Sequence, residues 1–574
     1  MAQTVRHNPI IAEPAEEPLL TSRQVVLALA GLFLLNLLLR GFYLRYDFVT
    51  GDEAIRAITA TRLLEGARLY ADIVTDKPPG STFFYAAVFR LFGRSMVAVH
   101  LVAALWNFAT SVVLYQVAAR FYDRRTGFWA ALLFIYFSTN YYTQDMMAAN
   151  TELLMALPYA ASFYFFIRAR SPMKGSGPVR VSSGRSVAPL LIAGLLTGLA
   201  ALFKQVAVFS LLFFALYEGV AVYRAWRKDS NAPAVLTEAG AAIVRLLTVG
   251  AGFAAVMISL VLWLRSTGAL DDFWRNVFEM GSLYMRALPR DVWLKFMAGR
   301  TLGYALFNLA LWSLAAFALV RSIRSKPTDE ALAKVRPVCP DREMDLIVSV
   351  WGGVSLVGVF TGGRFFGHYF IQVLPALSLL GARGMRTLLE GLAGAGRKRR
   401  VAFATLVLIF LVGLVRFHGR TAILAYETVT GTRTGTSESW GMTQREREAE
   451  VVANRLRGMA AEGEPIYIWG YALDVYWRSQ CRPASRYLLP YYTTGRFLDG
   501  AAVEPDNEEF WRESSSRLIE DLRRERPRVI LDVEANLMSE PDSEVTEFVR
   551  DNYRRDGQIG PDPHRPFAVY RLKE

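Results

Sequence analysis

The sequence has little of what a disulfide-stabilised or nucleotide-binding protein needs. It contains two cysteines, Cys339 and Cys481, among 574 residues, and the topology predicted below places them on opposite sides of a membrane. We therefore expect no disulfide framework. It has no G-x-x-x-x-G-K-[ST] pattern, and no G-x-G-x-x-G follows a predicted strand, which argues against a nucleotide-binding loop. No His/Asp cluster has the spacing of metal ligands, so neither a metal nor another cofactor is predicted.

A cleavable signal peptide is not expected either. The first apolar run begins only near Val25, after an acidic tail that contains prolines, and no small-residue cleavage site follows it.

Apolar side chains, by contrast, are abundant. Hydrophobic residues make up 53% of the chain and aromatic residues 13%, and the mean hydropathy is +0.23. Apolar runs of about 17–25 residues recur over the first 416 positions, which is the length a helix needs to cross about 30 Å of hydrocarbon. The sequence therefore predicts a polytopic α-helical membrane protein.

Eleven membrane spans are predicted, with loops rich in Lys and Arg after every second span. The positive-inside rule places such loops in the cytoplasm, so the N-terminus is expected inside and the C-terminus outside. The net charge of +13 lies largely in these loops and does not indicate a nucleic-acid partner. Residues 188–223 are interpreted as a hairpin that turns at Lys204 and Gln205, because one helix of that length would be far longer than the membrane is thick. The predicted spans are residues 24–44, 96–119, 127–144, 152–168, 188–203, 206–223, 243–264, 301–320, 344–361, 368–386 and 401–416.

The chain divides into a transmembrane domain at residues 1–416 and a C-terminal domain at residues 417–574 that is polar enough to fold in water. The first outer loop, residues 45–95, is expected to carry juxtamembrane helices. In residues 265–300, the stretch "DDFWRNVFEMGSLYMRALPRDVW" predicts a helix at the membrane interface. In the C-terminal domain, "PIYIWG" and "PRVILDV" predict strands, and "TQREREAEVVANRLRGMAAEG" predicts a helix closed by Gly463. We therefore expect a small extracytoplasmic α/β domain.

The first outer loop contains two groups of charged residues. Asp52 and Glu53 begin an amphipathic helix expected to lie on the membrane surface, where a carboxylate can accept a proton from a hydroxyl. Acids in a first turn also stabilise a helix by capping, so that explanation stays open. In the sequence Asp76-Lys77-Pro-Pro-Gly, the prolines keep the lysine out of a helix. Its ammonium group suits a phosphate, although a lysine that snorkels at a helix start is the alternative.

Other outer turns add further candidates. Glu152 begins the fourth span and is either a helix cap or a functional acid, and the hairpin places Lys204 on the outer face. In "TGGRFFGHYFIQVLP", Arg364 presents a fork of donors that matches phosphate oxygens, or anchors the loop at the interface, and His368 follows it. All these charges fall on one side of the membrane, which favours a membrane-bound substrate that carries phosphate.

These motifs resemble the GT-C glycosyltransferases, and more narrowly the protein O-mannosyltransferase and lipid A aminoarabinose transferase family. The resemblance is carried by the Asp-Glu pair soon after the first span, the Lys-Pro-Pro motif before a short helix, and the acid between the third and fourth spans. "GGRFFGHYFIQVLP" and "YIWGYALDVYWRSQCRPASRYLLPYY" are similar to the bacterial subgroup that acts on surface polysaccharides and lipopolysaccharide.

The resemblance implies an inverting glycosyltransferase of the bacterial inner membrane. It would move a hexose or pentose from a polyprenyl-phosphate donor to a hydroxyl of a lipid, glycan or protein on the extracytoplasmic face. Asp52 matches the family's catalytic acid, and Lys77 matches the lysine that binds the lipid phosphate. Glu152 matches a second catalytic acid, at a position where the family usually has Asp. The predicted donor-binding residues are Glu53, Asp76, Lys77, Lys204, Arg364 and His368.

The alternative function is a transporter or flippase of lipid-linked saccharides. Transporters usually place charges or broken helices at mid-membrane and are built from matching halves, whereas these charges gather at one face and no halves match. The sequence leaves open which sugar and which acceptor are used.

Overall fold

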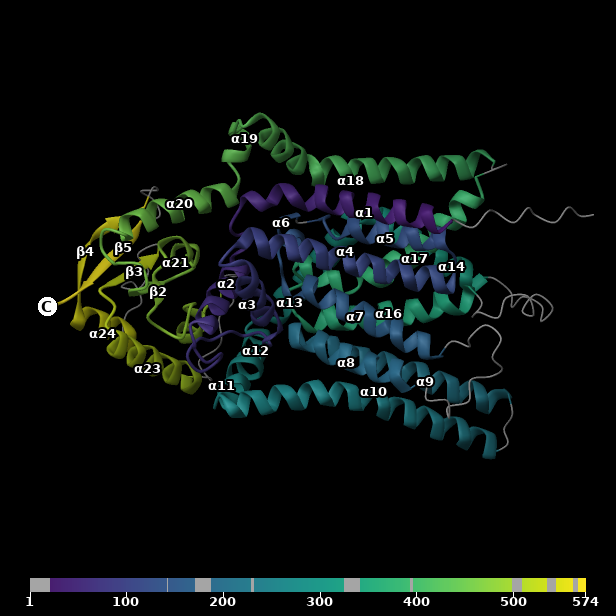
Figure 1. Ribbon diagram of the computed structural model, residues 1–574, viewed down its shortest axis with the longest axis horizontal. Helices are drawn as coiled ribbons and strands as arrows, with labels where there is room; N and C mark the ends of the chain where they lie inside the picture. The colour runs from purple at the N-terminus through teal and green to yellow at the C-terminus, as the bar shows by residue number, and fades with distance from the viewer. Residues whose placement is uncertain are drawn as a thin grey trace, which may run out of the picture.

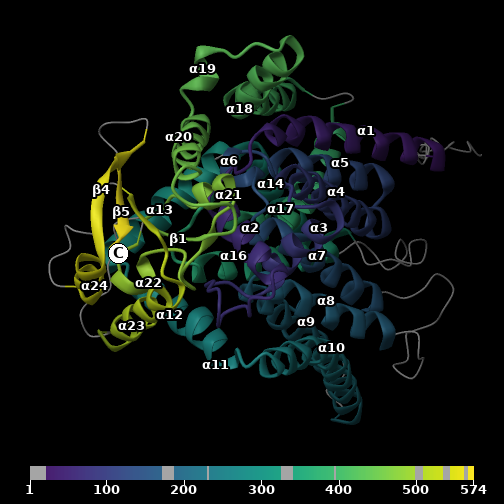
Figure 2. The same ribbon diagram turned by 60° about the vertical axis from the view of Figure 1, so that its left-hand side comes forward.

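A bundle of long helices is joined at one end to a small α/β domain in the computed structural model (Figure 1). The long helices run side by side, with α10 and α18 along opposite sides of the bundle (Figures 1 and 2). The sheet lies beyond the end of the bundle that carries α2 and α3 (Figure 1). The structure describes residues 21–141, 143–170, 187–228, 232–324, 341–392, 396–497, 508–533, 543–560 and 566–574.

Every predicted span overlaps a helix of the bundle. In the described part of the chain, six helices are long and apolar enough to cross a membrane, or seven if one bent pair counts as a single span. The multi-pass membrane class is thereby confirmed, whereas the number eleven is not. The overlapping helices are α1 (Ser22–Gly41), α4 (Met96–Phe121), α5 (Arg124–Phe137), α7 (Thr151–Arg170), α8 (Val187–Phe203), α9 (Phe209–Lys228), α10 (Ala232–Ser266), α14 (Leu309–Arg324), α16 (Asp341–Thr361), α17 (Leu374–Glu390) and α18 (Arg397–Thr430).

The segment around residues 270–324 differs from its prediction. The predicted helix runs without a break only from Leu270 to Arg286, as α11 (Leu270–Phe273), the π-helical η3 (Trp274–Glu279) and α12 (Met280–Arg286). Helix α12 ends just before Leu288-Pro289, because proline lacks an N–H and disfavours the helical conformation of the residue before it. A new helix, α13 (Arg290–Phe307), then meets α14 at a bend of 87°.

Three other boundaries also differ. The tenth predicted span begins as the 3₁₀ turn η4 (Gly367–Gln372), and the α-helix starts only at Leu374. Helix α20 (Gly441–Leu456) ends well before Gly463, which lies in a later turn with a φ of +79°. Helix α18 continues to Thr430, across the domain division at residue 416, which therefore stays a proposal. The prediction about Cys339 falls outside the described residues, and Cys481 is a buried free cysteine.

Short elements at the end of the bundle carry the charged residues. After α1 come η1 (Phe42–Arg45), α2 (Gly51–Leu64) and α3 (Gly80–Phe92), so the two predicted helices of the first loop are present. The hairpin turns at Lys204, as predicted, and continues as η2 (Gln205–Val208). Helix α6 (Thr143–Met147) precedes α7.

The C-terminal domain has a five-stranded sheet in the order β2-β1-β3-β5-β4. Strands β1 (Pro465–Trp469), β2 (Arg482–Pro483) and β3 (Val529–Val533) are parallel. Strand β5 (Phe567–Leu572) pairs antiparallel with β3, and β4 (Tyr553–Ile559) pairs antiparallel with β5, so the α/β prediction is confirmed. The helices of this region are α19 (Gly435–Glu438), α20, α21 (Asp474–Ser479), α22 (Tyr491–Thr494), α23 (Glu508–Glu525) and α24 (Glu544–Asn552).

The first loop is bound to both parts of the molecule. On one side, Trp477 of α21 packs against Phe48 and Phe89 with ring centroids 5.5 and 5.7 Å apart, and the Val74 amide donates to the Arg486 carbonyl at 2.9 Å. On the other side, α3 packs on α8, where a Cβ added to Gly80 would lie 2.6 Å from the backbone oxygen of Leu202. The loop is therefore held between the bundle and the C-terminal domain.

We predict that Gly80→Ala lowers the free energy of unfolding by about 1–3 kcal/mol, the usual cost of overpacking a tight contact. The added methyl meets backbone, which cannot swing away as a side chain could. Thermal unfolding of the purified chain in detergent measures the effect. Gly219→Ala on α9, where nothing lies within 4 Å of the new Cβ, is the control and should not destabilise the chain. Equal unfolding midpoints for Gly80→Ala and the native chain would contradict the close approach of α3 to α8.

Candidate active site

Five of the predicted site residues meet at the end of the bundle next to α2 and α3. Asp52 lies within electrostatic reach of Lys77, Glu152 and His368. Lys204 forms an ion pair with Glu152. These residues come from α2, the turn before α3, the start of α7, the α8–η2 turn and η4, so segments far apart in the sequence build one charged cluster.

Asp52 is the accessible carboxylate of this cluster. Its side chain is 48% exposed, and its Oδ2 accepts a hydrogen bond from the Arg56 guanidinium at 3.2 Å. Burial acts to raise the pKa of Asp52, but the charges of Arg56, His368 and Lys77 outweigh it and hold the pKa below the ordinary carboxyl value. At neutral pH Asp52 is therefore ionised and can accept a proton.

Glu152, the second predicted acid, has a different environment. It is 1% exposed, its Oε1 accepts from the Lys204 ammonium, and its Oε2 accepts from the Thr151 hydroxyl at 2.8 Å. The same Oε1 lies 3.7 Å from Nε2 of His368. Lys204 also lies over the ring of Tyr369, with its Nζ 3.5 Å from the centroid. Glu152 thus binds the surrounding cations. Its carboxylate is buried, whereas that of Asp52 is partly exposed.

Asp145 is a member of the cluster to which the sequence assigned no role. Its carboxylate accepts from Nδ1 of His368 and, at 3.1 Å, from the His368 backbone amide. These two bonds fix the imidazole ring so that Nε2 is directed toward Glu152. The only sequence signal was its place in the same predicted outer turn as Glu152.

Lys77 and Asp76 form an ion pair of 2.6 Å at the start of the proline turn. The backbone carbonyl of Lys77 accepts from the Tyr70 hydroxyl at 2.9 Å, which anchors the turn. Burial alone would lower the pKa of Lys77, but Asp76, with a smaller effect of Asp52, raises it to about 12. Lys77 is therefore a permanent positive charge that remains partly exposed.

Glu53 is buried and points away from its neighbour Asp52, into the protein. Its carboxylate accepts from the amides of Val49 and Ala149, both at 2.7 Å, and lies 3.1 Å from Nε2 of His100. The sequence placed Glu53 with the substrate-binding residues. In the structure, its hydrogen bonds connect three segments of the chain. His100, near the start of α4, and Arg56, which also contacts Asn150, were not anticipated from the sequence.

Arg364 packs against Tyr284, a residue next to the cluster. Its guanidinium is buried, donates to the Tyr284 carbonyl at 3.0 Å and lies 4.0 Å from the centroid of the Tyr284 ring. Tyr284 in turn interacts electrostatically with Lys77 and packs against Phe497 of the C-terminal domain with ring centroids 4.8 Å apart. Arg364 thus supports an aromatic wall that connects the cluster to the C-terminal domain. Among the described residues, no group of His, Cys, Asp and Glu is arranged to hold a metal ion.

The burial of Glu53 predicts an acid-sensitive fold. Burial acts to raise the pKa of Glu53, but its bonds to His100 and the two amides lower it below the ordinary value of 4.5. The stabilisation from ionised Glu53 is therefore present above about pH 4.5 and is lost as the pH falls through the folded-state pKa. We expect Glu53→Gln to cost about 1.5–3 kcal/mol of stability at pH 7 and less at pH 3.

Unfolding midpoints measured from pH 7 to pH 3 check this. Glu65→Gln, at an exposed position of the same region, should leave the pH profile of the native chain unchanged. A Glu53→Gln protein that loses stability in acid as steeply as the native chain would show that Glu53 is not responsible.

Comparisons with known proteins bear on this arrangement. Residues 76–249, a little under a third of the chain, match the family model described as dolichyl-phosphate-mannose-protein mannosyltransferase. Two crystal structures of ArnT from Cupriavidus metallidurans are similar over 96% of this chain and 98% of theirs. The form bound to undecaprenyl phosphate is 13% identical with a TM-score of 0.53, and the apo form is 15% identical with a TM-score of 0.52.

No curated protein matches the chain in sequence. At these identities the similarity to ArnT shows the fold, and the matched family model covers the Lys77 turn, Glu152 and Lys204. The chain is therefore a multi-pass membrane protein with the GT-C fold, and it resembles the protein mannosyltransferase family over residues 76–249.

Proposed function

We propose that the chain is an integral-membrane glycosyltransferase that moves a sugar from a polyprenyl-phosphate donor to an acceptor hydroxyl on the extracytoplasmic face. The observation that carries the proposal is that the charged cluster combines an exposed carboxylate with nearby cations. Asp52 is an ionised carboxylate with an open face, and the cations Lys77 and Lys204 lie within its electrostatic reach. The fold shared with ArnT, determined with bound undecaprenyl phosphate, supports a lipid-phosphate donor.

The reaction would be a single displacement. The carboxylate of Asp52 takes the proton of the acceptor hydroxyl while that oxygen forms a bond to C1 of the sugar. The bond from C1 to the phosphate oxygen breaks on the opposite side, and its electron pair stays on the phosphate, so the anomeric centre is inverted. Lys77 and Lys204 stabilise the negative charge that remains on the lipid phosphate.

A bound donor would also prepare Asp52 as a base. In the free protein the nearby cations hold its pKa below the ordinary carboxyl value. A phosphate placed against Lys77 neutralises part of that positive field, which raises the pKa of Asp52 and strengthens it as a proton acceptor. Proton transfer from the acceptor is thereby coupled to the presence of the donor.

The remaining predicted residues and Asp145 act as positioning groups in this proposal. Glu152 and Asp145 hold Lys204 and His368 in place, Asp76 orients Lys77, and Glu53 fixes the start of α2. Arg364 acts through Tyr284. The same proposal includes a hexose or pentose as the donor sugar and a lipid, glycan or protein as the acceptor. It also includes a cytoplasmic N-terminus and a location in the inner membrane.

We expect Asp52→Asn to lower transfer by about 10²–10⁴-fold, since general-base catalysis contributes a factor of that size. Asn keeps the size of the side chain and can still accept from Arg56, so the fold should be retained. Mass spectrometry of envelope glycolipids and glycoproteins, from cells with the native or the variant chain, measures transfer. Asp291→Asn, at an exposed position, should transfer normally. Near-normal transfer by folded Asp52→Asn would remove Asp52 as the base.

We expect Lys77→Ala to raise KM for the lipid-phosphate donor by about 10–100-fold, as the loss of one charge-assisted contact predicts, with a smaller effect on KM for the acceptor. Steady-state kinetics with each substrate varied separately makes this distinction. Lys295→Ala, which removes an exposed lysine paired with Asp291, is the control and should change neither value. An unchanged KM for the donor in Lys77→Ala would contradict phosphate binding by Lys77.

A further inference from the structure

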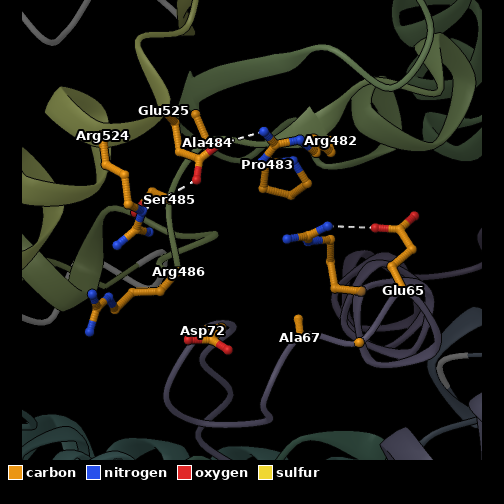
Figure 3. Close-up of a pocket in the computed structure, with 12 residues that line it drawn as sticks. Glu65, Ala67, Asp72, Arg482, Pro483, Ala484, Ser485, Arg486, Arg524 and Glu525 are labelled. Atoms are coloured by element: carbon orange, nitrogen blue, oxygen red, sulfur yellow. Dashed lines mark hydrogen bonds and ion pairs between the residues drawn. The ribbon is translucent and has the colours of Figure 1, made fainter.

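A polar cavity of about 350 Å³ lies between the first loop and the C-terminal domain, away from the charged cluster (Figure 3). One wall is formed by the end of α2 and the turn that follows it, and the other by β2, the residues after it and the end of α23. Figure 3 shows Arg482 and Glu525 on one side, with Glu65 and Asp72 across the opening. None of these residues takes part in the reaction proposed above.

Each of the four arginines that line the cavity is paired with a carboxylate. Arg62 pairs with Glu65 at 2.5 Å, and Arg482 pairs with Glu525 at 2.5 Å. Arg486 makes two bonds to the buried carboxylate of Asp521, at 2.9 and 3.0 Å, and Arg524 reaches the same carboxylate at 2.9 Å. A phosphate or another strong anion would have to compete with these carboxylates for every guanidinium group.

Such a lining suits hydroxyl groups. A hydroxyl can donate to a carboxylate and accept from a guanidinium at the same time, so neighbouring hydroxyls of a sugar ring could each bridge one of the ion pairs. The volume lies at the low end of the about 300–1,000 Å³ typical of small-molecule sites. We propose that this cavity binds a neutral saccharide that forms part of the acceptor.

The walls are fixed before any ligand binds. Asp72 accepts two bonds from the Arg68 guanidinium, at 2.8 and 2.9 Å, and a third from the Arg68 backbone amide. The backbone bond from Val74 to Arg486 ties this turn to the opposite wall. A saccharide would therefore meet a preorganised surface and lose little free energy in ordering it.

The assignment to the acceptor follows from the position of the cavity and rests on the proposed function. Helix α2 carries Asp52 in its first turn and Arg62 in its last, which are ten residues and about 15 Å apart along the axis. A donor sugar whose phosphate lies against Lys77 reacts beside Asp52 and cannot also fill the cavity. A glycan acceptor of several rings could lie in the cavity and extend to Asp52.

Binding can be tested on the purified full chain in detergent, without donor. Saturation-transfer NMR with the neutral disaccharides maltose, cellobiose, lactose and chitobiose, and competition by inorganic phosphate, measures affinity and preference. We expect at least one disaccharide to bind, and Arg482→Ala and Glu525→Gln each to weaken it by about tenfold or more, the equivalent of one charge-assisted hydrogen bond. Glu525→Gln keeps the size of the side chain, which protects the test if Arg482→Ala folds poorly.

Arg571→Ala is the matched control, because it breaks a partly exposed ion pair with Asp556 in the same domain but outside the cavity. It should bind as the native chain does. Unchanged binding in Arg482→Ala and Glu525→Gln, no binding of any of the four disaccharides, or displacement of the sugar by low concentrations of phosphate would each overturn the proposal.

The outcome is separable from that of the proposed function. Asp52→Asn should bind the disaccharide normally while it loses transfer. Cavity-dependent binding in a chain that shows no transfer at all would support the saccharide site and reject the transferase. Transfer could instead depend on Asp52 and be equal in native and Arg482→Ala chains for every glycan acceptor. That result would support the transferase and reject the saccharide site.

Discussion

The position of Asp52 depends on the buried carboxylate of the next residue. Glu53 accepts bonds from the loop before α2 and from the loop before α7, and it contacts His100 on α4. Successive residues of a helix point about 100° apart, so the inward position of Glu53 leaves Asp52 on a different face of α2, where its side chain is partly exposed. The Asp-Glu pair is thus one anchor and one exposed carboxylate, and the two acids cannot exchange roles without moving the start of α2.

Buried charge sets the second constraint. Isolated charges at this depth would cost several kcal/mol each, so every acid and cation of the cluster needs a partner. The partners form a chain in which Asp145 binds His368, His368 lies near Glu152, and Glu152 binds Lys204. Lys77 and Asp52 have their own partners, Asp76 and Arg56, but both stay partly exposed. Substrate can therefore approach these two groups without stripping the buried pairs of their counter-ions.

The sequence predicted the parts of this site that depend on local pattern. Apolar run length identified the helices, the proline turn located the start of α3 near Gly80, and the outer-face topology gathered Asp52, Lys77, Glu152 and Lys204 at one end of the bundle. Local pattern could not tell the inward acid from the outward one, and the choice of Asp52 as the catalytic acid came from the family resemblance alone. That distinction depends on His100 and the Ala149 amide, which reach Glu53 only through tertiary packing. The role of Asp145 and the contact of Arg364 with Tyr284 likewise depend on tertiary packing.

The C-terminal domain contacts the first loop and the residues that surround the charged cluster. It closes one side of the first loop through Trp477 and Arg486, and its Phe497 packs on Tyr284 next to Lys77. Tyr491 contacts Phe497 and interacts electrostatically with Asp76. The charged groups that would bind a phosphate come from the bundle and the first loop, whereas much of the surrounding wall comes from the C-terminal domain. In the proposed reaction the phosphate is common to all polyprenyl-phosphate donors, so the wall is where we expect sugars and acceptors to be distinguished.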